Sequence, residues 1–319
     1  MKLNQNLKRL GIGLLFVCLV INSILAYSRT DDFTGFRFEE GKYQSSFKFS
    51  IENDLIVLPV TVEGKRLNFI FDTGMNSILV FDKRNIKDWR ARDKHKIKFS
   101  GLGVNNLVQG IRFDGLSVNM PNIQGKGLSL VATQYSSFSE QFESIEIHGI
   151  FGYQLLAKFI VQIDYANKSI TLINPDYFVK PYNASQLDLS IINTKPYINC
   201  PIIVDEKSYE LNFLVDTGAG VPLILNSIAL NNTRHKGKSV PVGVGLAGPL
   251  MATKVTVNDL VLGKFHLTKD FEAWMPNKDS YPNESNKIRR DGTIGSKILG
   301  RYRVTFDYFN NKLYLQEQP

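Results

Sequence analysis

The chain has 319 residues, enough for two domains that each bury a hydrophobic core. Hydrophobic residues make up 43% and charged residues 21%, a globular composition that excludes a mainly disordered chain. The formal net charge is +8, but the basic residues are scattered rather than gathered in one stripe, so we expect no nucleic-acid partner.

The N-terminal segment has the pattern of an export signal. Lys2, Lys8 and Arg9 precede an apolar stretch from Leu10 to Ile21, and the segment contains no acidic residue. Without these three positive charges, the net charge of +8 becomes +5. We therefore expect an exported protein, whether periplasmic, secreted or membrane-tethered. Residues 1–27 are assigned to a signal peptide or, as the alternative, to an uncleaved N-terminal membrane anchor.

After the signal, short apolar runs separated by turn residues predict a series of β-strands. Residues 46–51 roughly alternate apolar and polar side chains, as a half-buried strand does. Apolar runs at 58–62 and 67–71 flank Glu63-Gly64-Lys65, which predicts a β-hairpin. The second run ends in Asp-Thr-Gly, so we expect the carboxylate of Asp72 on a tight turn where a buried strand stops.

Farther along the first half, predicted strands alternate with polar segments. Residues 82–98 are polar and basic, which predicts an exposed helix or loop rather than a binding element. Residues 99–113 predict a hairpin, and an apolar strand at 147–152 runs through glycines into a short helix. A strand pair at 161–173 precedes a segment with Pro175, Pro181 and several asparagines, and we assign residues 176–195 to a linker.

The second half of the chain repeats the first. The octet Leu67–Gly74 recurs as Leu211–Gly218, with six of eight positions identical. The interval between Gly152 and Gly295 is only one position shorter than the interval between the two octets, so nearly every loop has kept its length. A period of this size is that of a domain, which indicates a duplication and not a solenoid.

The repeat determines the predicted domain organisation. We predict an N-terminal lobe at 28–175 and a C-terminal lobe at 196–319, joined by the linker. Each lobe is expected to contain about seven short strands and at most two short helices, so the predicted class is all-β. Cys200 is the only cysteine outside the signal. Because it lies beside Pro201 in an apolar strand, we expect a small core residue and not a nucleophile.

Two Asp-Thr-Gly turns in matching frames carry a resemblance to a known family. Each follows a hydrophobic hairpin, and each is followed later in its half by an apolar strand, Ile150-Phe151-Gly152 in one half and Thr293-Ile294-Gly295 in the other. From about residue 50 to the C-terminus, the chain resembles the pepsin and retropepsin superfamily of aspartic proteases, in a signal-bearing form similar to bacterial aspartyl proteases. The resemblance implies a bilobal acid-protease fold, with two homologous β-barrel-like lobes and the active site at their interface.

The resemblance assigns the catalytic chemistry to Asp72 and Asp216. Two carboxylates side by side cannot both ionise, so they share one proton. One carboxylate then withdraws a proton from water while the other hydrogen-bonds the scissile carbonyl oxygen, and the tetrahedral intermediate collapses as the amine is protonated. The implied function is that of an aspartic endopeptidase acting on peptide or protein substrates, with no metal and no organic cofactor. We expect a monomer, because one chain supplies both half-sites.

Four neighbouring residues are implied to support this dyad. Thr73 and Thr217 resemble the family's paired hydroxyls, which hydrogen-bond across the lobe interface to the opposite backbone. Gly74 and Gly218 let the backbone approach its neighbour where a Cβ atom would clash. On the strands beneath, a glycine at each equivalent position is expected to permit the same close crossing.

Three nearby positions distinguish the two halves. Ala219 fits the family pattern, whereas Met75 stands where a small Ser or Ala is usual. The bulky side chain of Met75 could raise the pKa of Asp72 or narrow the site. His148 occupies a position where an acidic or polar residue is common, and it could tune the pH dependence or be a structural histidine.

The predicted flaps are two hairpins that would close over a substrate, residues 99–113 and residues 242–255. Neither contains a tyrosine, so the flap tyrosine of pepsin is absent. An extended peptide is expected to bind beneath the flap as an added strand. The candidate substrate-binding residues of the flaps are Gly101, Leu102, Gly103, Gly245 and Leu246.

Three other functions are weighed against the protease. A catalytically inactive relative that binds peptides or regulates a partner is kept open by Met75, although both aspartates and both turn glycines are retained. A half-site that works only in a homodimer is disfavoured by the internal repeat. Gly243–Gly248 matches the dinucleotide fingerprint by letter, but Pro249 follows and no long amphipathic helix comes after it, so we assign the segment to the second flap.

Overall fold

The computed structural model describes residues 33–100, 107–133, 140–230, 237–246, 248–268, 271–277 and 290–318. Residues from Gly35 onward form one compact unit. The predicted signal or anchor at 1–27 lies outside the described residues. Within the described part, no helix is both long enough and apolar enough to cross a membrane.

The described chain is mostly β, which confirms the predicted class at that level. Its α-helices, α3 (Tyr153–Leu156) and α4 (Ser296–Leu299), have four residues each, and η1 (Lys83–Asn85) and η2 (Pro175–Tyr177) are short 3-10 helices. The strands are more numerous than the seven or so expected in each half, because several have only two to four residues and are too short to show a periodic pattern.

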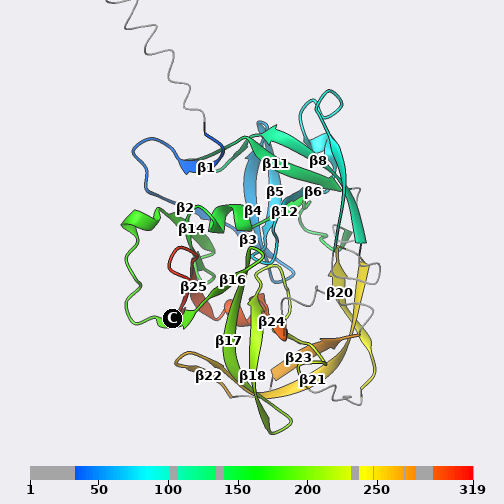
Figure 1. The fold of residues 1–319 in the computed structure, drawn as a ribbon, viewed down its shortest axis with the longest axis vertical. Helices are drawn as coiled ribbons and strands as arrows, with labels where there is room; N and C mark the ends of the chain where they lie inside the picture. Colours follow the sequence, from blue (N-terminus) through cyan, green and yellow to red (C-terminus); the bar gives the residue numbers. More distant parts are fainter. Residues whose placement is uncertain are drawn as a thin grey trace, which may run out of the picture. The chain divides into compact units, whose positions relative to one another are not determined.

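Strands β1 to β14 belong to the first half of the chain (Figure 1). Their bounds are β1 (Gly35–Phe38), β2 (Gln44–Lys48), β3 (Ser50–Glu52), β4 (Leu55–Val62), β5 (Lys65–Phe71), β6 (Ile78–Val80), β7 (His95–Ser100), β8 (Leu107–Leu116), β9 (Val118–Asn119), β10 (Ile123–Lys126), β11 (Leu128–Thr133), β12 (Gly149–Phe151), β13 (Ile160–Asp164) and β14 (Ser169–Ile173).

The second half provides β15 to β26. Their bounds are β15 (Ser185–Asp188), β16 (Ser190–Ile192), β17 (Lys195–Val204), β18 (Lys207–Val215), β19 (Leu223–Leu225), β20 (Val240–Gly245), β21 (Gly248–Leu262), β22 (Phe265–Leu267), β23 (Phe271–Pro276), β24 (Gly292–Ile294), β25 (Tyr302–Asp307) and β26 (Lys312–Glu317).

Two similar mixed sheets follow from the internal repeat. The N-terminal sheet has the order β3-β4-β5-β12-β6-β11-β8-β7, and the C-terminal sheet has the order β16-β17-β18-β24-β19-β23-β21-β20. In the first, β12 lies between β5, to which it is parallel, and β6, to which it is antiparallel. In the second, β24 lies in the same way between β18 and β19. The equivalent strands of the duplicated sequence therefore occupy equivalent places.

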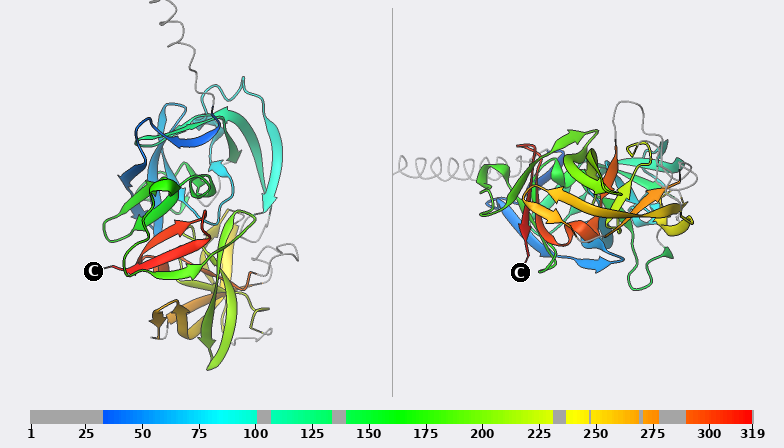
Figure 2. Two further views of the ribbon diagram at one scale, coloured as in Figure 1. Left: turned by 60° about the vertical axis from the view of Figure 1, so that its left-hand side comes forward. Right: turned by 90° about the horizontal axis from the view of Figure 1, so that it is seen from below.

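A third, antiparallel sheet joins the halves, and we call it the bridging sheet. Its order is β15-β26-β25-β13-β14-β2, with three strands from each half. At its centre, β13 pairs with β25, and Gln162 lies opposite Thr305, its equivalent in the repeat. Figure 2 shows the red strands β25 and β26 beside strands from the middle of the chain. The segment predicted as a linker, residues 176–195, contains β15 and β16, so part of it belongs to the sheets.

The predicted turn between β4 and β5 is confirmed. Glu63 and Gly64 form a two-residue loop with φ angles of 49° and 83°, the left-handed conformation that tight hairpins of this type need. Asp205 and Glu206 form the equivalent loop between β17 and β18, with φ angles of 49° and 62°. Both hairpins therefore lead into the strand that ends at an Asp-Thr-Gly turn.

Two hydrophobic clusters hold the sheets together. The larger contains buried residues of both halves, including Cys200, which is 2% exposed. Burial raises the pKa of the Cys200 thiol to about 12, which agrees with the predicted core role. The smaller, here the second cluster, lies on the N-terminal sheet and comprises Leu55, Val57, Ile70, Leu79, Phe81, Val131, Phe142, Ile147 and Ile150.

Candidate active site

The two Asp-Thr-Gly turns begin where β5 and β18 end. The backbone N–H of Asp72 donates to the carbonyl of Phe151, and that of Asp216 donates to the carbonyl of Ile294, each at 2.9 Å. Phe151 and Ile294 are the last residues of β12 and β24, the strands that run parallel to β5 and β18. The position of each aspartate is thus set by the middle of its own sheet.

Reciprocal hydrogen bonds between two threonines tie the turns together. The Thr73 hydroxyl donates to the carbonyl of Val215 at 2.6 Å and accepts from the N–H of Thr217 at 3.1 Å. The Thr217 hydroxyl donates to the carbonyl of Phe71 at 2.8 Å and accepts from the N–H of Thr73 at 3.1 Å. Both threonines are fully buried. The four bonds bring together equivalent residues from the two halves of the chain, as predicted for this pair.

The glycine after each threonine orients the carboxylate of its own turn. The N–H of Gly74 donates to Asp72 Oδ1 at 2.7 Å, and the N–H of Gly218 donates to Asp216 Oδ1 at 2.9 Å. Each carboxylate therefore has one oxygen bound to its turn, and its other oxygen is the one left to meet a partner or a substrate.

Each turn glycine also lies against the carboxylate of the opposite turn. A Cβ atom on Gly218 would stand 2.2 Å from the carboxyl carbon of Asp72, and one on Gly74 would stand 2.9 Å from Asp216 Oδ2. Separations this short are not seen between real Cβ atoms and their neighbours, so a side chain here would displace the carboxylate. The contacts place Asp72 and Asp216 side by side between the two glycines.

The carboxyl group of Asp72 is affected strongly by its neighbour in the pair. Burial, then the charge of Asp216, then a side-chain hydrogen bond with Asp216 raise the pKa of Asp72 well above its ordinary value. The N–H of Gly74 and the charge of Lys195 act in the opposite direction and are weaker. The proximity of the two carboxyl groups and their burial therefore favour a protonated form of Asp72.

The glycines expected on the strands beneath the turns come directly after β12 and β24, where they begin α3 and α4, and they allow the predicted close crossing. A Cβ atom on Gly152 would lie 1.8 Å from the carbonyl oxygen of Asp72. One on Gly295 would lie 2.0 Å from the carbonyl oxygen of Val221 and 2.6 Å from that of Ala219. The backbone of each Asp-Thr-Gly turn therefore rests directly on the strand next to it.

The residues after the two turns have different surroundings. Met75 is half-buried and packs against the second cluster. The carbonyl of Ala219 accepts two hydrogen bonds from Ser296, one from the N–H at 2.9 Å and one from the hydroxyl at 3.0 Å. The two turns therefore have different neighbours at this position. The Asp72 turn contacts an apolar surface through Met75, and the Asp216 turn is bonded to the start of α4 through Ala219.

The two predicted flaps correspond to hairpins of equivalent strands, β7–β8 and β20–β21. Gly101, Leu102 and Gly103 lie outside the described residues. Gly245 ends β20 opposite Gly248, and Leu246 packs against the second cluster.

The β20–β21 hairpin also forms a hydrogen bond with the first half of the chain. The Nε2 atom of Gln141 donates to the carbonyl of Val244 at 3.3 Å. Through this bond and the packing of Leu246, the β20–β21 hairpin contacts the first half of the chain beside the N-terminal sheet.

His148 has a structural setting. Its Nδ1 accepts from the N–H of Asn68 at 3.2 Å, and burial lowers the pKa of the imidazole despite the neighbouring charge of Glu146. Its equivalent in the second half, Asp291, accepts from the N–H of Asn212 at 2.9 Å. Both side chains therefore bind the strand beside them, which favours the structural alternative for His148.

Two further residues lie near the dyad, and no sequence motif predicts them there. Lys195 begins β17 and acts on the charge of Asp72 from another strand, with no motif around it to reveal this. Tyr165 is 8% exposed, and its hydroxyl has no hydrogen-bond partner among the described residues. Burial and then the charge of Asp216 raise the pKa of this phenol. The sequence repeats this pair as Asp164-Tyr165 and Asp307-Tyr308, but nothing in it indicates that Tyr165 lies near the dyad.

Within the described ranges, no group of three or more His, Cys, Asp or Glu side chains could hold a metal ion. A scan of protein-family models found no match for this chain, and a search of curated proteins found none either.

Proposed function

We propose that this chain is a bilobal aspartic endopeptidase whose two sheets form the lobes of an acid-protease fold. The observation that carries the proposal is the facing pair Asp72 and Asp216, each held by its own turn glycine and packed against the glycine of the other turn. The reciprocal threonine bonds support it, because they fix the two turns as one unit. Such a pair can activate water without a nucleophilic side chain.

The raised pKa of Asp72 supports a division of roles within the pair. Asp72, with its raised pKa, holds the shared proton and hydrogen-bonds the scissile carbonyl oxygen. Asp216 takes a proton from the attacking water, and a tetrahedral intermediate forms. Its collapse breaks the C–N bond as the leaving amine is protonated. The substrate is an extended peptide or protein segment that lies across both turns and adds as a strand beneath the β7–β8 and β20–β21 hairpins.

We further propose that one chain is sufficient and that the enzyme acts outside the cytoplasm, free or tethered by its N-terminal segment. Sufficiency of one chain is supported by the presence of both half-sites in the compact unit that starts at Gly35. Activity per molecule should then be independent of protein concentration. Activity that rises with the square of the concentration would instead indicate that the site forms between two copies.

The direct test is cleavage of a mixed peptide library by the wild type and by the Asp72→Asn and Asp216→Asn variants. Both substitutions keep the shape of the side chain and remove its ability to share the proton, so both should abolish cleavage. If the wild type is as inert as the variants across acid and neutral pH while all three bind peptide, the chain is a peptide-binding relative and not a protease.

A further inference from the structure

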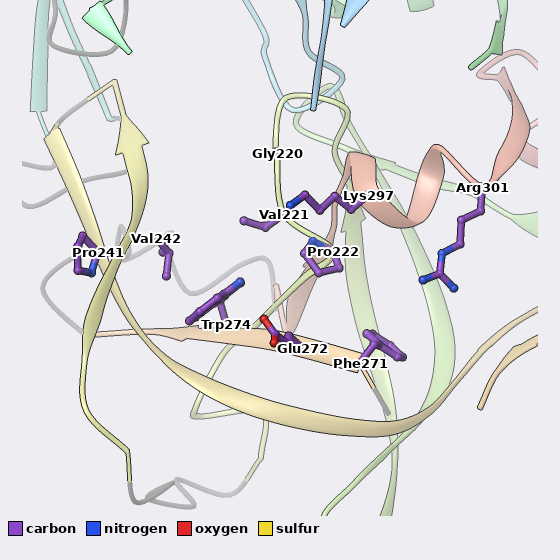
Figure 3. Close-up of a pocket in the computed structure, with 10 residues that line it drawn as sticks. All are labelled: Gly220, Val221, Pro222, Pro241, Val242, Phe271, Glu272, Trp274, Lys297 and Arg301. Carbon is purple, nitrogen blue, oxygen red and sulfur yellow. The ribbon is translucent and has the colours of Figure 1, made fainter. Parts of the chain in front are cut away.

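A cavity of about 580 Å³ opens beside the turn that carries Asp216 (Figure 3). One wall is the loop Gly220-Val221-Pro222, which follows closely after this aspartate in the sequence. The N–H of Gly295 donates to the carbonyl of Pro222 at 2.9 Å, so this loop is held against the start of α4. The backbone that positions the aspartate therefore also shapes the cavity.

The other walls come from the β20–β21 hairpin and from β23. Figure 3 shows Pro241 and Val242 on the hairpin at one side, with Trp274 and Glu272 on β23 between the hairpin and the loop. In the proposed function, this hairpin and the Asp216 turn are the two elements that would enclose an extended peptide. A side chain of a peptide bound there would enter the cavity.

Two cations stand at the α4 side of the cavity. Lys297 lies on α4 and Arg301 lies two residues beyond its end, and both side chains line the cavity. Lys297 Nζ lies 3.2 Å from Asp54 Oδ2, and Glu272 is paired with Lys254. Among the described residues, the guanidinium of Arg301 makes no ion pair. The lining thus carries two cations and one carboxylate, and Arg301 is free to bind an anion.

The equivalent surface of the first half is closed and less charged. Val131 pairs with Leu79 as Trp274 pairs with Ile224, yet Val131 is 4% exposed and belongs to the second cluster. The equivalent of Lys297 in the first half is Gln154, whose Nε2 donates to the carbonyl of Asn76 at 2.9 Å. The two sides of the dyad therefore offer different surfaces, one apolar and filled, the other open and cationic.

We propose that this cavity is a specificity pocket that selects a Glu or Asp side chain of the peptide, so that substrates bind in one direction. The peptide ligand rests on the proposed function. The methylene groups of the side chain would pack on Pro222 and Trp274, and its carboxylate would bind Arg301, with Lys297 adding to the positive potential. An acidic residue of the peptide that lies instead against the apolar surface of the first half would add no binding energy.

The test uses matched peptide pairs that differ only by Glu against Gln at one position, scanned along the peptide. We expect wild-type kcat/KM to favour Glu by about 10-fold at a single position, the range of a hydrogen bond to a charged partner. Arg301→Gln should lose this preference, and Arg301→Glu should prefer a Lys-containing peptide. Lys207→Gln, which removes the same charge from the β17–β18 hairpin, should keep the wild-type preference.

Binding of the same peptides to the Asp216→Asn variant separates the pocket from the catalysis. If wild type cleaves nothing but this variant binds the Glu peptide more tightly than the Gln peptide, and Arg301→Gln removes the difference, the pocket stands and the protease proposal fails. If peptides are cleaved or bound with no Glu preference at any position, or if Arg301→Gln leaves a preference unchanged, the pocket proposal is overturned.

Discussion

Replacing Thr217 by valine removes a buried hydroxyl and leaves the shape of the side chain almost unchanged. In the folded protein, this hydroxyl donates to the carbonyl of Phe71 and accepts from the N–H of Thr73. Both bonds cross from one half of the chain to the other, and Thr217 is fully buried. No water can replace the lost partner without entering the packed interface between the turns.

The expected cost follows from the two backbone groups that lose their partner. A buried polar group left unsatisfied costs about 1–3 kcal/mol, so Thr217→Val should lower the free energy of unfolding by about 2–6 kcal/mol. Because a typical domain is stable by only about 5–15 kcal/mol, this is a large fraction of the total. Thr73→Val should lose a similar amount, since its bonds to Val215 and Thr217 mirror the first pair.

Denaturant unfolding of the wild type and the variants measures this loss. Thr217→Ser is the matched control, because serine keeps the hydroxyl and removes one methyl group, which should cost about 1 kcal/mol. The double variant Thr73→Val/Thr217→Val removes all four bonds, none of which the two single variants have in common, and should lose more stability than either single variant. If Thr217→Val is no less stable than Thr217→Ser, the reciprocal bonds do not hold the turns together.

Three further outcomes are expected. Gly218→Ala should lower kcat/KM about 100-fold or more at unchanged fold by circular dichroism, because its Cβ atom would lie 2.2 Å from the carboxyl carbon of Asp72; activity within a few-fold of wild type would contradict this contact. The pKa of Asp72 is raised in the folded state, so its contribution to stability is complete at acid pH and is lost as the pH rises, by up to about 1.4 kcal/mol per pH unit. Asp72→Asn should therefore gain stability relative to wild type as the pH rises, and a constant difference between the two would refute the shift. Cys200, buried and with a thiol pKa of about 12, should resist thiol reagents near neutral pH until the protein is unfolded, whereas full labelling of the native protein would disprove its burial.

The centre of the fold could be predicted because the duplication preserved both sequence and spacing. The octet that ends in each Asp-Thr-Gly located the ends of β5 and β18, and the repeated glycines located the close crossings at Gly152 and Gly295. A single Asp-Thr-Gly is a weak sequence signal because it often occurs by chance. Two copies at equivalent places in the repeat make the signal specific. The threonine pair was implied by the family resemblance, and the hydrogen bonds confirm its geometry.

The bridging sheet could not be predicted, because its pairings join distant and short segments. Gln162 and Thr305 come from opposite halves of the chain, and nothing local to either strand specifies the other. The segment assigned to a linker shows prolines and asparagines, yet β15 within it pairs with β26 because that edge of the sheet is available. The pairing of β13 with β25 and of β15 with β26 therefore becomes visible only in the folded structure.

The asymmetry of the site also needed the structure. Met75 was recognised as unusual in the sequence, but its packing against the second cluster depends on the folded N-terminal sheet. The contact of Leu246 with the same cluster depends on the second half of the chain reaching the first. No sequence motif singled out Lys297 or Arg301. Their place beside the cavity comes from the position of α4 after Gly295, which a pattern of residue types does not specify.

The pH dependence of kcat/KM for a cleaved peptide tests the central claim most directly, because it reports the protonation of the free enzyme. If Asp72 and Asp216 share one proton, the profile is bell-shaped: activity falls at low pH when both carboxyls are protonated, and falls again at high pH when Asp72 loses its proton. Both Asn variants should be inactive across the whole range. A profile that stays level or rises through the high-pH limb, or an Asn variant that keeps wild-type activity, would contradict the shared proton and with it the proposed mechanism.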